Sequence, residues 1–217
     1  MRRIKEEFLD IICAAIKLKG RCVLEIGSGD GVHSVGLAQR CRELFGIDPD
    51  PHNVERAKSR CISNAFFHQG KAEALTGFPD KVFDSVFFTL SFHHVPAELM
   101  PVAIDEAVRV VKSHGHIVFL EPGDVGSYFD AEIRFDAGDG DEREAKRNAH
   151  RAMLAHPHLE IIREYPDETI VEFDSLSDFE TAMTPKRNRG ELESFLRERA
   201  YRLSAERRIN LFRPKHR

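Results

Sequence analysis

Short apolar stretches alternate with segments of helical periodicity along most of this chain. The apolar stretches that predict strands lie near 22–27, 43–48, 64–68, 82–90 and 115–121. The segments that predict helices lie near 32–41, 51–61 and 97–112. Strands that alternate with helices in this way build a parallel sheet with helices on both of its faces. We therefore predict an α/β fold that forms a single domain over residues 1–217.

The two ends of the chain carry further helical patterns. Residues 1–20 predict a helix that would cap an edge of the sheet. One face of this helix is formed by Ile4, Phe8, Ile11, Ile12, Ala15 and Ile16. Near the other end, Ser177 and Glu180 have the spacing of a capping box. A helical spacing follows in Leu192, Phe195, Leu196 and Leu203. Because Arg208–Phe212 predicts a last strand, we expect residues 158–217 to complete the sheet.

The segment 123–157 is too long for an ordinary connection within a compact domain. It holds Tyr128, Phe129, Arg134 and Phe135, then the polar run 136–144, with a helical pattern over 141–155. Such a segment is either a lid over a site at the carboxyl ends of the strands or a disordered loop. We favour a lid for the substrate, because binding loops commonly lie at that edge of the sheet.

The composition is that of an ordinary globular protein, with 41% hydrophobic and 31% charged residues. Its net charge of −4 provides no general affinity for nucleic acid. The charge is uneven, since residues 186–217 hold eleven Lys or Arg and four Asp or Glu. This basic segment is either a solvated surface or a contact for an acidic partner. We favour the solvated surface, because the basic residues follow an amphipathic pattern.

The cysteines and the longest apolar run bear on the compartment. Cys13, Cys22, Cys41 and Cys61 show neither close pairs nor a metal-binding spacing. The longest apolar run, 11–16, is six residues long and follows several acidic residues, so it is too short for a signal peptide or a membrane span. We therefore expect reduced thiols, a cytoplasmic protein and no membrane partner, while the oligomeric state stays open.

The most informative motif is Val23-Leu24-Glu25-Ile26-Gly27-Ser28-Gly29-Asp30-Gly31, in which a buried strand ends in a glycine-rich turn. A dinucleotide-binding loop would have its third glycine one residue later, at position 32, which is Val here. Glu25 and Asp30 would also repel a pyrophosphate in a poorly solvated cleft. Asp48, at the end of the next strand, can accept hydrogen bonds from a ribose diol. A positively charged nucleoside such as S-adenosylmethionine fits this arrangement better than NAD.

Two histidines, His93 and His94, follow the strand near 82–90. A second substrate would meet the nucleoside at this end of the sheet, so either histidine is a candidate general base. The alternative is that both histidines only shape the loop by hydrogen bonding.

Two other groups invite a metal interpretation. Asp136, Asp139 and Asp141 lack the spacing of a calcium loop, because position 143 is Arg. A helical two-ligand spacing is also missing from His150, His156 and His158. We therefore predict no metal site and expect these histidines at the surface or in the lid.

With these motifs the chain resembles the class I S-adenosylmethionine-dependent methyltransferases, in the small-molecule branch (methyltransferase type 11) that includes quinone-biosynthesis-type enzymes. The resemblance covers 21–122 and rests on the glycine loop, Asp48, 70–75, 83–95 and 106–121. It implies a Rossmann-like, doubly wound sheet of seven strands, mostly parallel, whose antiparallel last strand lies beside a strand near 169–173. It also implies a cofactor site formed by Glu25, Gly27, Ser28, Gly29, Gly31, Asp48, Pro49, Ala72, Glu73 and Ser91.

Two places depart from the family pattern. Many relatives have Asp at the position of Lys71, and that Asp accepts a hydrogen bond from the adenine amino group. The resemblance then leaves the Ala72 amide for a ring nitrogen and Glu73 as the nearest acceptor, although Glu73 could equally be solvated. Ser113-His114-Gly115 replaces the usual Pro-Gly-Gly turn, and we expect it to change only the turn.

The resemblance implies an in-line displacement in which a small-molecule acceptor attacks the sulfonium methyl carbon and S-adenosylhomocysteine leaves. Enzymes that methylate exocyclic amino groups or amides usually carry Asn/Asp-Pro-Pro-Tyr after this strand, so Ser91-Phe92-His93-His94 disfavours those acceptors. We predict a methyltransferase for a small molecule. The alternatives are a non-catalytic module that binds the cofactor and acts through a partner and, less favoured, a nicotinamide-dependent oxidoreductase.

Overall fold

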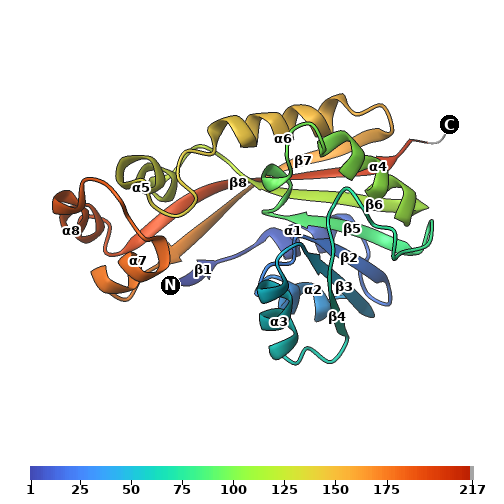
Figure 1. Ribbon diagram of the computed structural model, residues 1–217, viewed down its shortest axis with the longest axis horizontal. Helices are drawn as coiled ribbons and strands as arrows, with labels where there is room; N and C mark the ends of the chain where they lie inside the picture. Colours follow the sequence, from blue (N-terminus) through green and yellow to red (C-terminus); the bar gives the residue numbers. More distant parts are fainter. Residues whose placement is uncertain (216–217) are drawn as a thin grey trace.

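The computed structural model describes residues 1–215 and contains one eight-stranded sheet, in the order β1-β7-β8-β6-β5-β2-β3-β4 (Figure 1). The strands are β1 (Arg2–Lys5), β2 (Cys22–Ile26), β3 (Glu43–Asp48), β4 (Ala65–Gln69), β5 (Phe83–Thr89), β6 (Val111–Pro122), β7 (Leu159–Glu172) and β8 (Arg202–Pro214). The helices are α1 (Phe8–Ala15), α2 (Ser34–Ala38), α3 (Pro51–Ser59), α4 (Met100–Val110), α5 (Ser127–Phe135), α6 (Arg143–Ala155), α7 (Leu176–Met183) and α8 (Arg189–Arg197), with a short 3-10 helix η1 (Phe92–His94).

The sheet is parallel in one part and antiparallel in the other. The run from β4 through β3, β2 and β5 to β6 is parallel, whereas β8, β7 and β1 each pair antiparallel with their neighbours. The strand β8 lies between β6 and β7, so the prediction of an inserted, antiparallel last strand is confirmed. Parallel strands end at a common edge, and the candidate site lies there.

One strand more is present than the seven predicted. Arg2 and Arg3 pair with Glu172 and Val171 of β7, so the chain begins as an edge strand and α1 starts only at Phe8. Ile4 was expected on the buried face of the first helix but is 47% exposed. The helical spacing of Ile4 was misleading because the residues before Phe8 find backbone partners on β7.

Helices cover both faces of the sheet. Alternate residues of β2 point to opposite faces, so Leu24 packs with α4 and α6, whereas Val23 packs with α1 and α2. A smaller cluster joins α3 to Phe67 of β4. Asp50 caps α3, since its side chain accepts a hydrogen bond from the His52 amide and Pro51 starts the helix, as predicted.

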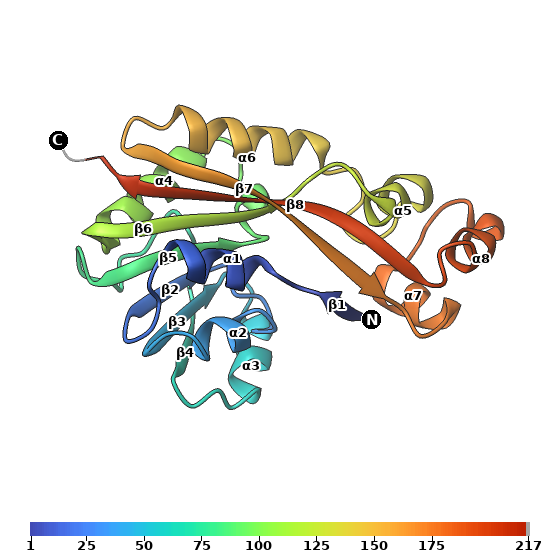
Figure 2. The ribbon, with the colours of Figure 1, turned by 180° about the vertical axis from the view of Figure 1, so that it is seen from behind.

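The strands β7 and β8 extend together beyond β6 and carry α5, α7 and α8 at their far end (Figure 2). These helices share a separate apolar core that includes Phe135, Phe179 and Phe195. The predicted capping box is wrong by two residues, because Ser175 caps α7 by accepting a hydrogen bond from the Asp178 amide. Leu203, assigned to a helical spacing, lies in β8.

The last strand is longer than the predicted segment. Ile209 and Phe212 pair with Leu120 and Ile117 of β6, whereas Thr169 of β7 faces Ala205 rather than the 208–212 segment. Within residues 1–215, no helix combines the length and the apolar composition that a membrane span requires.

Candidate functional site

Two adjoining cavities lie at the carboxyl ends of β2, β3 and β5. The Asp48 cavity, of about 480 Å³, lies against the ends of β2 and β3 and the loop after β4. The His93 cavity, of about 320 Å³, lies between the glycine loop, η1, α5 and α6. Both cavities are lined by Gly27, Gly29, Leu90 and His94, so they form two halves of one site.

The glycine loop turns sharply between the two cavities. Gly27 and Gly29 have φ angles of +73° and +54°, a region that favours glycine. A Cβ atom on Gly27 would lie 2.4 Å from the Cβ of Ser91, so the loop packs closely against the end of β5. The Ser91 hydroxyl donates to the Ile26 carbonyl at 2.6 Å and holds the two segments together.

Asp48 anchors the loop from the neighbouring strand. Its Oδ2 atom accepts a hydrogen bond from the Gly29 amide at 2.9 Å, and its Oδ1 atom accepts from the Asp50 amide and the Asn53 side chain. Asp48 is 6% exposed and lines the Asp48 cavity. A carboxylate has about four acceptor positions, so Asp48 keeps capacity for a ligand hydroxyl.

The remaining residues predicted for the cofactor mostly face these cavities. Pro49, Ala72, Glu73 and Ser91 line the Asp48 cavity, and Glu25 and Ser28 line the His93 cavity. Gly31 lines neither cavity. It lies against Ala57 of α3, where a Cβ atom would come within 3.1 Å of the Ala57 side chain.

Buried polar atoms without partners cluster in the His93 cavity. Glu25 is fully buried, its Oε2 atom accepts a hydrogen bond from the Ser34 hydroxyl, and its Oε1 atom has no partner. The Ser28 hydroxyl is also buried without a partner, whereas the buried Thr89 hydroxyl lies close enough to Glu25 to lower the pKa of that carboxyl somewhat. Burial raises the pKa of Glu25 to about 7. Such atoms are costly unless a ligand or water satisfies them, and they suit a polar, cationic ligand.

The two predicted histidines differ in their surroundings. His93 is buried, and its Nδ1 atom lies 2.5 Å from Oε2 of Glu121, at the end of β6. The same carboxylate accepts hydrogen bonds from the Phe92 and His93 amides. Burial lowers the pKa of His93, but the charge and hydrogen bond of Glu121 outweigh it and leave that pKa above its ordinary value. His94 is largely exposed and stacks near His93, with ring centres 4.1 Å apart.

Glu142, just before α6, joins the two histidines. Its carboxylate lies 3.6 Å from Nε2 of His93 and 3.4 Å from Nδ1 of His94. The three ligand atoms lie within 4.8 Å of one another, so this group could hold a metal ion. A second such group joins His156 and His158 to Asp105. In the described part of the chain, the three aspartates that the sequence analysis considered as metal ligands, at positions 136, 139 and 141, form no group of this kind.

The segment predicted as a lid contains α5 and α6, both of which contribute to the His93 cavity. Tyr128, Phe129 and Glu132 come from α5, and Lys146 from α6. The Lys146 ammonium lies 5.2 Å from the centre of the Phe129 ring and 3.8 Å from the Glu132 carboxylate. Burial raises the pKa of Glu132 to about 7, although Lys146 opposes this shift.

Arg134 and Phe135 of the same segment do not reach this site. They pack against the side chain of Phe195 in the distant helical core. The aromatic composition alone could not separate these residues from Tyr128 and Phe129.

The sequence interpretation missed several residues of the site. Asn53 is one turn into α3, behind Asp48, and Glu142 and Lys146 lie in the predicted helix of the lid. Glu121 had the clearest signal, because an acid that directly follows a buried apolar strand is unusual. Sequence alone did not indicate that Glu121 meets His93.

Comparisons with known proteins relate part of the chain to methyltransferases. Residues 24–119 match the model of a methyltransferase domain family. An uncharacterized methyltransferase of Bacillus velezensis is 27% identical over 112 residues, which cover 52% of this chain and 52% of that protein. A ubiquinone biosynthesis O-methyltransferase of Alkalilimnicola ehrlichii is 30% identical over 105 residues, which cover 47% of this chain and 42% of that protein. The chain thus spans about half the length of these relatives.

Nearly the whole chain shares its fold with a solved structure. A Bacillus halodurans protein that is provisionally assigned as a methyltransferase superposes with a TM-score of 0.65 and 16% identity, over 96% of this chain and 99% of that chain. This likeness shows the fold. The predicted Rossmann-like α/β fold is therefore confirmed, with eight strands in place of seven.

Proposed function

We propose that this chain, whose residues 24–119 match a methyltransferase domain family, transfers a methyl group from S-adenosylmethionine to a small molecule. The observation that carries the proposal is the two-part site that meets at Gly27 and Gly29. One part offers the Asp48 carboxylate to a ribose diol. The other part contains buried polar atoms without partners and the paired base His93.

Different residues of the site would bind different parts of the cofactor. Asp48 would accept a hydrogen bond from a ribose hydroxyl, and the buried Ala72 would lie beside the adenine. Glu25 and Ser28 would face the charged amino-acid end, where Glu25 would be held ionised by a positive charge. S-adenosylmethionine supplies, when bound, a methyl group that is already activated by its sulfonium sulfur.

His93 would remove a proton from the acceptor. Because Glu121 holds Nδ1, a proton on that atom leaves Nε2 as the basic nitrogen toward the cavity. We assign the role of base to His93 rather than His94, because His94 is exposed and its carboxylate neighbour Glu142 lies 3.4 Å away, whereas Glu121 lies 2.5 Å from the buried His93 ring. Alignment of the acceptor and exclusion of water can contribute on the order of 7 to 11 kcal/mol to barrier reduction.

The segment 123–157 would act as the lid of the acceptor side. Its α5 supplies Phe129, its α6 supplies Lys146, and Glu142 just before α6 also lines the His93 cavity, which supports a role in acceptor selection. The four free cysteines fit the reducing cytoplasm that we expect as the compartment.

Calorimetric titration of the full chain tests the proposal. We expect S-adenosylmethionine and S-adenosylhomocysteine to bind and NAD not to bind; binding of NAD alone would refute the cofactor assignment. Acceptor-dependent release of S-adenosylhomocysteine then tests catalysis, by incubation with matched sets of phenols, catechols and thiols. Cofactor binding with no turnover on any acceptor or on a metabolite extract would instead favour a binding module that acts through a partner.

A further inference from the structure

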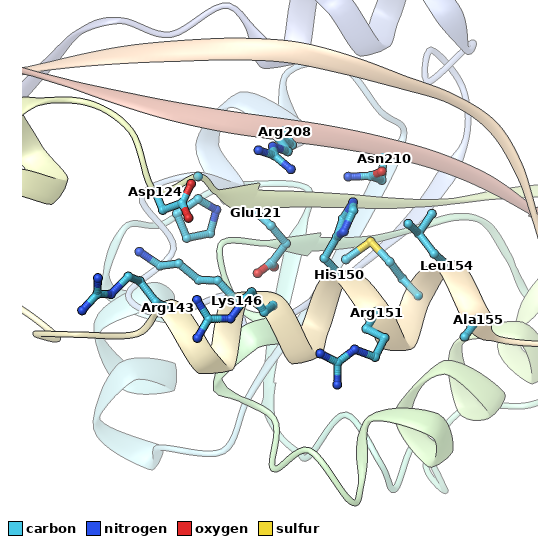
Figure 3. Close-up of a pocket in the computed structure, with 14 residues that line it drawn as sticks. Glu121, Asp124, Arg143, Lys146, His150, Arg151, Leu154, Ala155, Arg208 and Asn210 are labelled. Atoms are coloured by element: carbon cyan, nitrogen blue, oxygen red, sulfur yellow. The ribbon is translucent and has the colours of Figure 1, made fainter.

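A third cavity lies beside the His93 cavity, between α6 and the strands β6 and β8. This groove, of about 560 Å³, is lined by residues that include Glu121, Lys146, Arg147, Arg151, Arg208 and Asn210 (Figure 3). We infer that it binds an anionic group, a carboxylate or a phosphate, on the methyl acceptor. The inference rests on the proposed function, and it specifies the class of acceptor.

The charge of the groove favours an anion. Its lining includes five Lys or Arg residues and two carboxylates. One of the two, Glu121, already accepts hydrogen bonds from His93 and from two backbone amides. Its negative charge is therefore compensated by these donors on the His93 side of the groove. Among residues 1–215, no carboxylate lies within ion-pair distance of Arg147 or Arg151. Arg143 pairs with Asp141 and Lys146 lies 3.8 Å from Glu132, so the positive charge that remains for an anion comes from Arg147, Arg151 and Arg208.

Asn210 supplies the second, independent observation. It is fully buried, and neither its amide nitrogen nor its amide oxygen has a hydrogen-bond partner. Figure 3 shows Asn210 on β8 directed toward His150 of α6, with Arg208 on the same strand. A buried amide with no partner is costly. An anionic oxygen beside Asn210 would accept its N–H and remove part of that cost.

Arg208 and Asn210 form one wall of the groove. They are two residues apart on β8, so both side chains project from the same face of the sheet. Arg208 is paired across from Glu121 on β6, and its nearest acid in the described structure, Glu206, lies at 3.8 Å. Arg208 can therefore turn its guanidinium to an anion, to which arginine donates two parallel hydrogen bonds.

The groove is continuous with the proposed acceptor site. Pro122, Gly123 and Lys146 line both this groove and the His93 cavity. The Glu121 side chain separates the anion-binding wall from His93, because it lines the groove and binds the His93 ring. One molecule can thus place an anionic group near Arg208 and a nucleophile near His93, which selects acidic over neutral acceptors.

Side-chain amide NMR of the full chain tests the anion site without an identified acceptor. Inorganic phosphate and acetate are titrated separately at constant ionic strength, with chloride as the reference anion. We expect phosphate or acetate to shift the Asn210 amide signals, and the R208Q variant to weaken that binding by about tenfold or more, as for one lost charged hydrogen bond. The control R213Q changes an arginine of the same strand that pairs with the exposed Glu160, and it should bind like the parent.

The N210L variant provides a second test that does not depend on loss of stability. Because it removes two unpaired buried atoms, we expect an unchanged or higher melting temperature together with loss of anion binding. Turnover is then compared on matched acceptors, such as catechol and 3,4-dihydroxybenzoate. We expect the parent to prefer the acidic acceptor by about tenfold or more, and R208Q to lose this preference.

The outcomes separate the two proposals. Absence of any Asn210 shift with either anion, or a preference for neutral acceptors, would overturn the anion site while S-adenosylhomocysteine still binds. A chain that does not bind S-adenosylhomocysteine would refute the proposed function, whatever the anion titration shows.

Discussion

The Nδ1 atom of His93, in η1 just after β5, lies 2.5 Å from the Oε2 atom of Glu121 at the end of the neighbouring strand β6. Both side chains are buried, and Glu121 also accepts two amide hydrogen bonds from η1. The carboxylate therefore fixes the orientation of the ring and stabilises its protonated form. A base that is oriented in this way depends on its carboxylate for both its geometry and its pKa.

Replacing His93 with Gln should lower turnover strongly and leave cofactor binding nearly unchanged. General base catalysis contributes about a hundred- to ten-thousandfold in rate, so we expect a loss of that order at saturating acceptor. The matched variant His94→Gln should retain most of the rate, because His94 is exposed. Equal rates for parent and His93→Gln would refute the base assignment.

Glu121→Gln should shift the pH dependence of catalysis to lower pH. The pKa of His93 is raised in the parent, so its neutral, basic form accumulates only above the ordinary value of about 6.5. Loss of the carboxylate lowers that pKa, and NMR titration of the His93 ring measures it directly. A titration midpoint that stays in place would contradict the assignment.

The same variant should change stability in a pH-dependent way. A raised histidine pKa stabilises the folded state fully below the unfolded value, and this contribution disappears as the pH rises through the folded value. Urea unfolding of Glu121→Gln should therefore show a larger loss of stability at about pH 5.5 than at about pH 8.5. An equal loss at both pH values would mean that the histidine charge contributes nothing.

That Glu25, the glycines and Asp48 lie together could be predicted, because each follows or ends a strand of the local β-α-β pattern. Glu25, the glycines and Asp48 end adjacent parallel strands, so the alternation of strands and helices already brings them together. Glu121 could not be assigned to His93, because their contact depends on the pairing of β5 with β6, in which Thr89 faces Leu120. A sequence pattern does not specify such a long-range register.

The groove under α6 and the first strand were missed for related reasons. In the sequence, Arg208 and Asn210 have the pattern of ordinary residues of a last strand. Only the packing of α6 over β8 encloses them in a groove. Arg2–Lys5 is too short to show a strand period, and its place depends on the exposed edge of β7.

The basic segment 186–217 was expected to be a solvated surface. Its last two residues, 216–217, lie outside the described residues. In the described part of this segment, Arg202, Arg207 and Arg213 pair with acids of β7.

Glu25 should link cofactor affinity to pH. Burial raises its pKa to about 7, and a cationic ligand would favour its ionised form, so binding should release a proton below that pH. Affinity should therefore rise with pH through about 7, and calorimetry in buffers of different ionisation enthalpy counts the protons. An affinity that does not change between about pH 6 and pH 8 would contradict this role.

Glu25→Gln should separate stability from binding. In the unliganded parent, the folded state keeps a proton on Glu25 that the unfolded chain releases at lower pH, so stability falls as the pH rises from 4.5 to about 7. The variant lacks this loss, and we expect a higher melting temperature than the parent above pH 7 together with weaker cofactor binding. A variant that is less stable at every pH would show that Glu25 is already satisfied by the protein.

Under the proposed function, zinc should inhibit methyl transfer reversibly. The two histidines and Glu142 present atoms 3.4 to 3.6 Å apart, close to the separation of about 3.3 Å between ligands of a tetrahedral zinc ion. An ion there would occupy the basic nitrogen of His93. We expect inhibition that EDTA relieves and that Glu142→Gln weakens, while His158→Gln, in the second group around Asp105, leaves it unchanged.

Gly27→Ala should destabilise the chain because the loop approaches β5 without room for a Cβ atom. That atom would lie 2.4 Å from the Ser91 Cβ, and the φ of +73° is strained for alanine. We expect a loss on the order of 2 kcal/mol or more in urea unfolding. Gly77→Ala is the control, since a Cβ there meets nothing within 4 Å and should leave the free energy of unfolding nearly unchanged. Combining Gly27→Ala with Ser91→Gly should recover part of the loss, because it removes the clash but not the φ strain; a strictly additive double variant would show that the two residues do not touch.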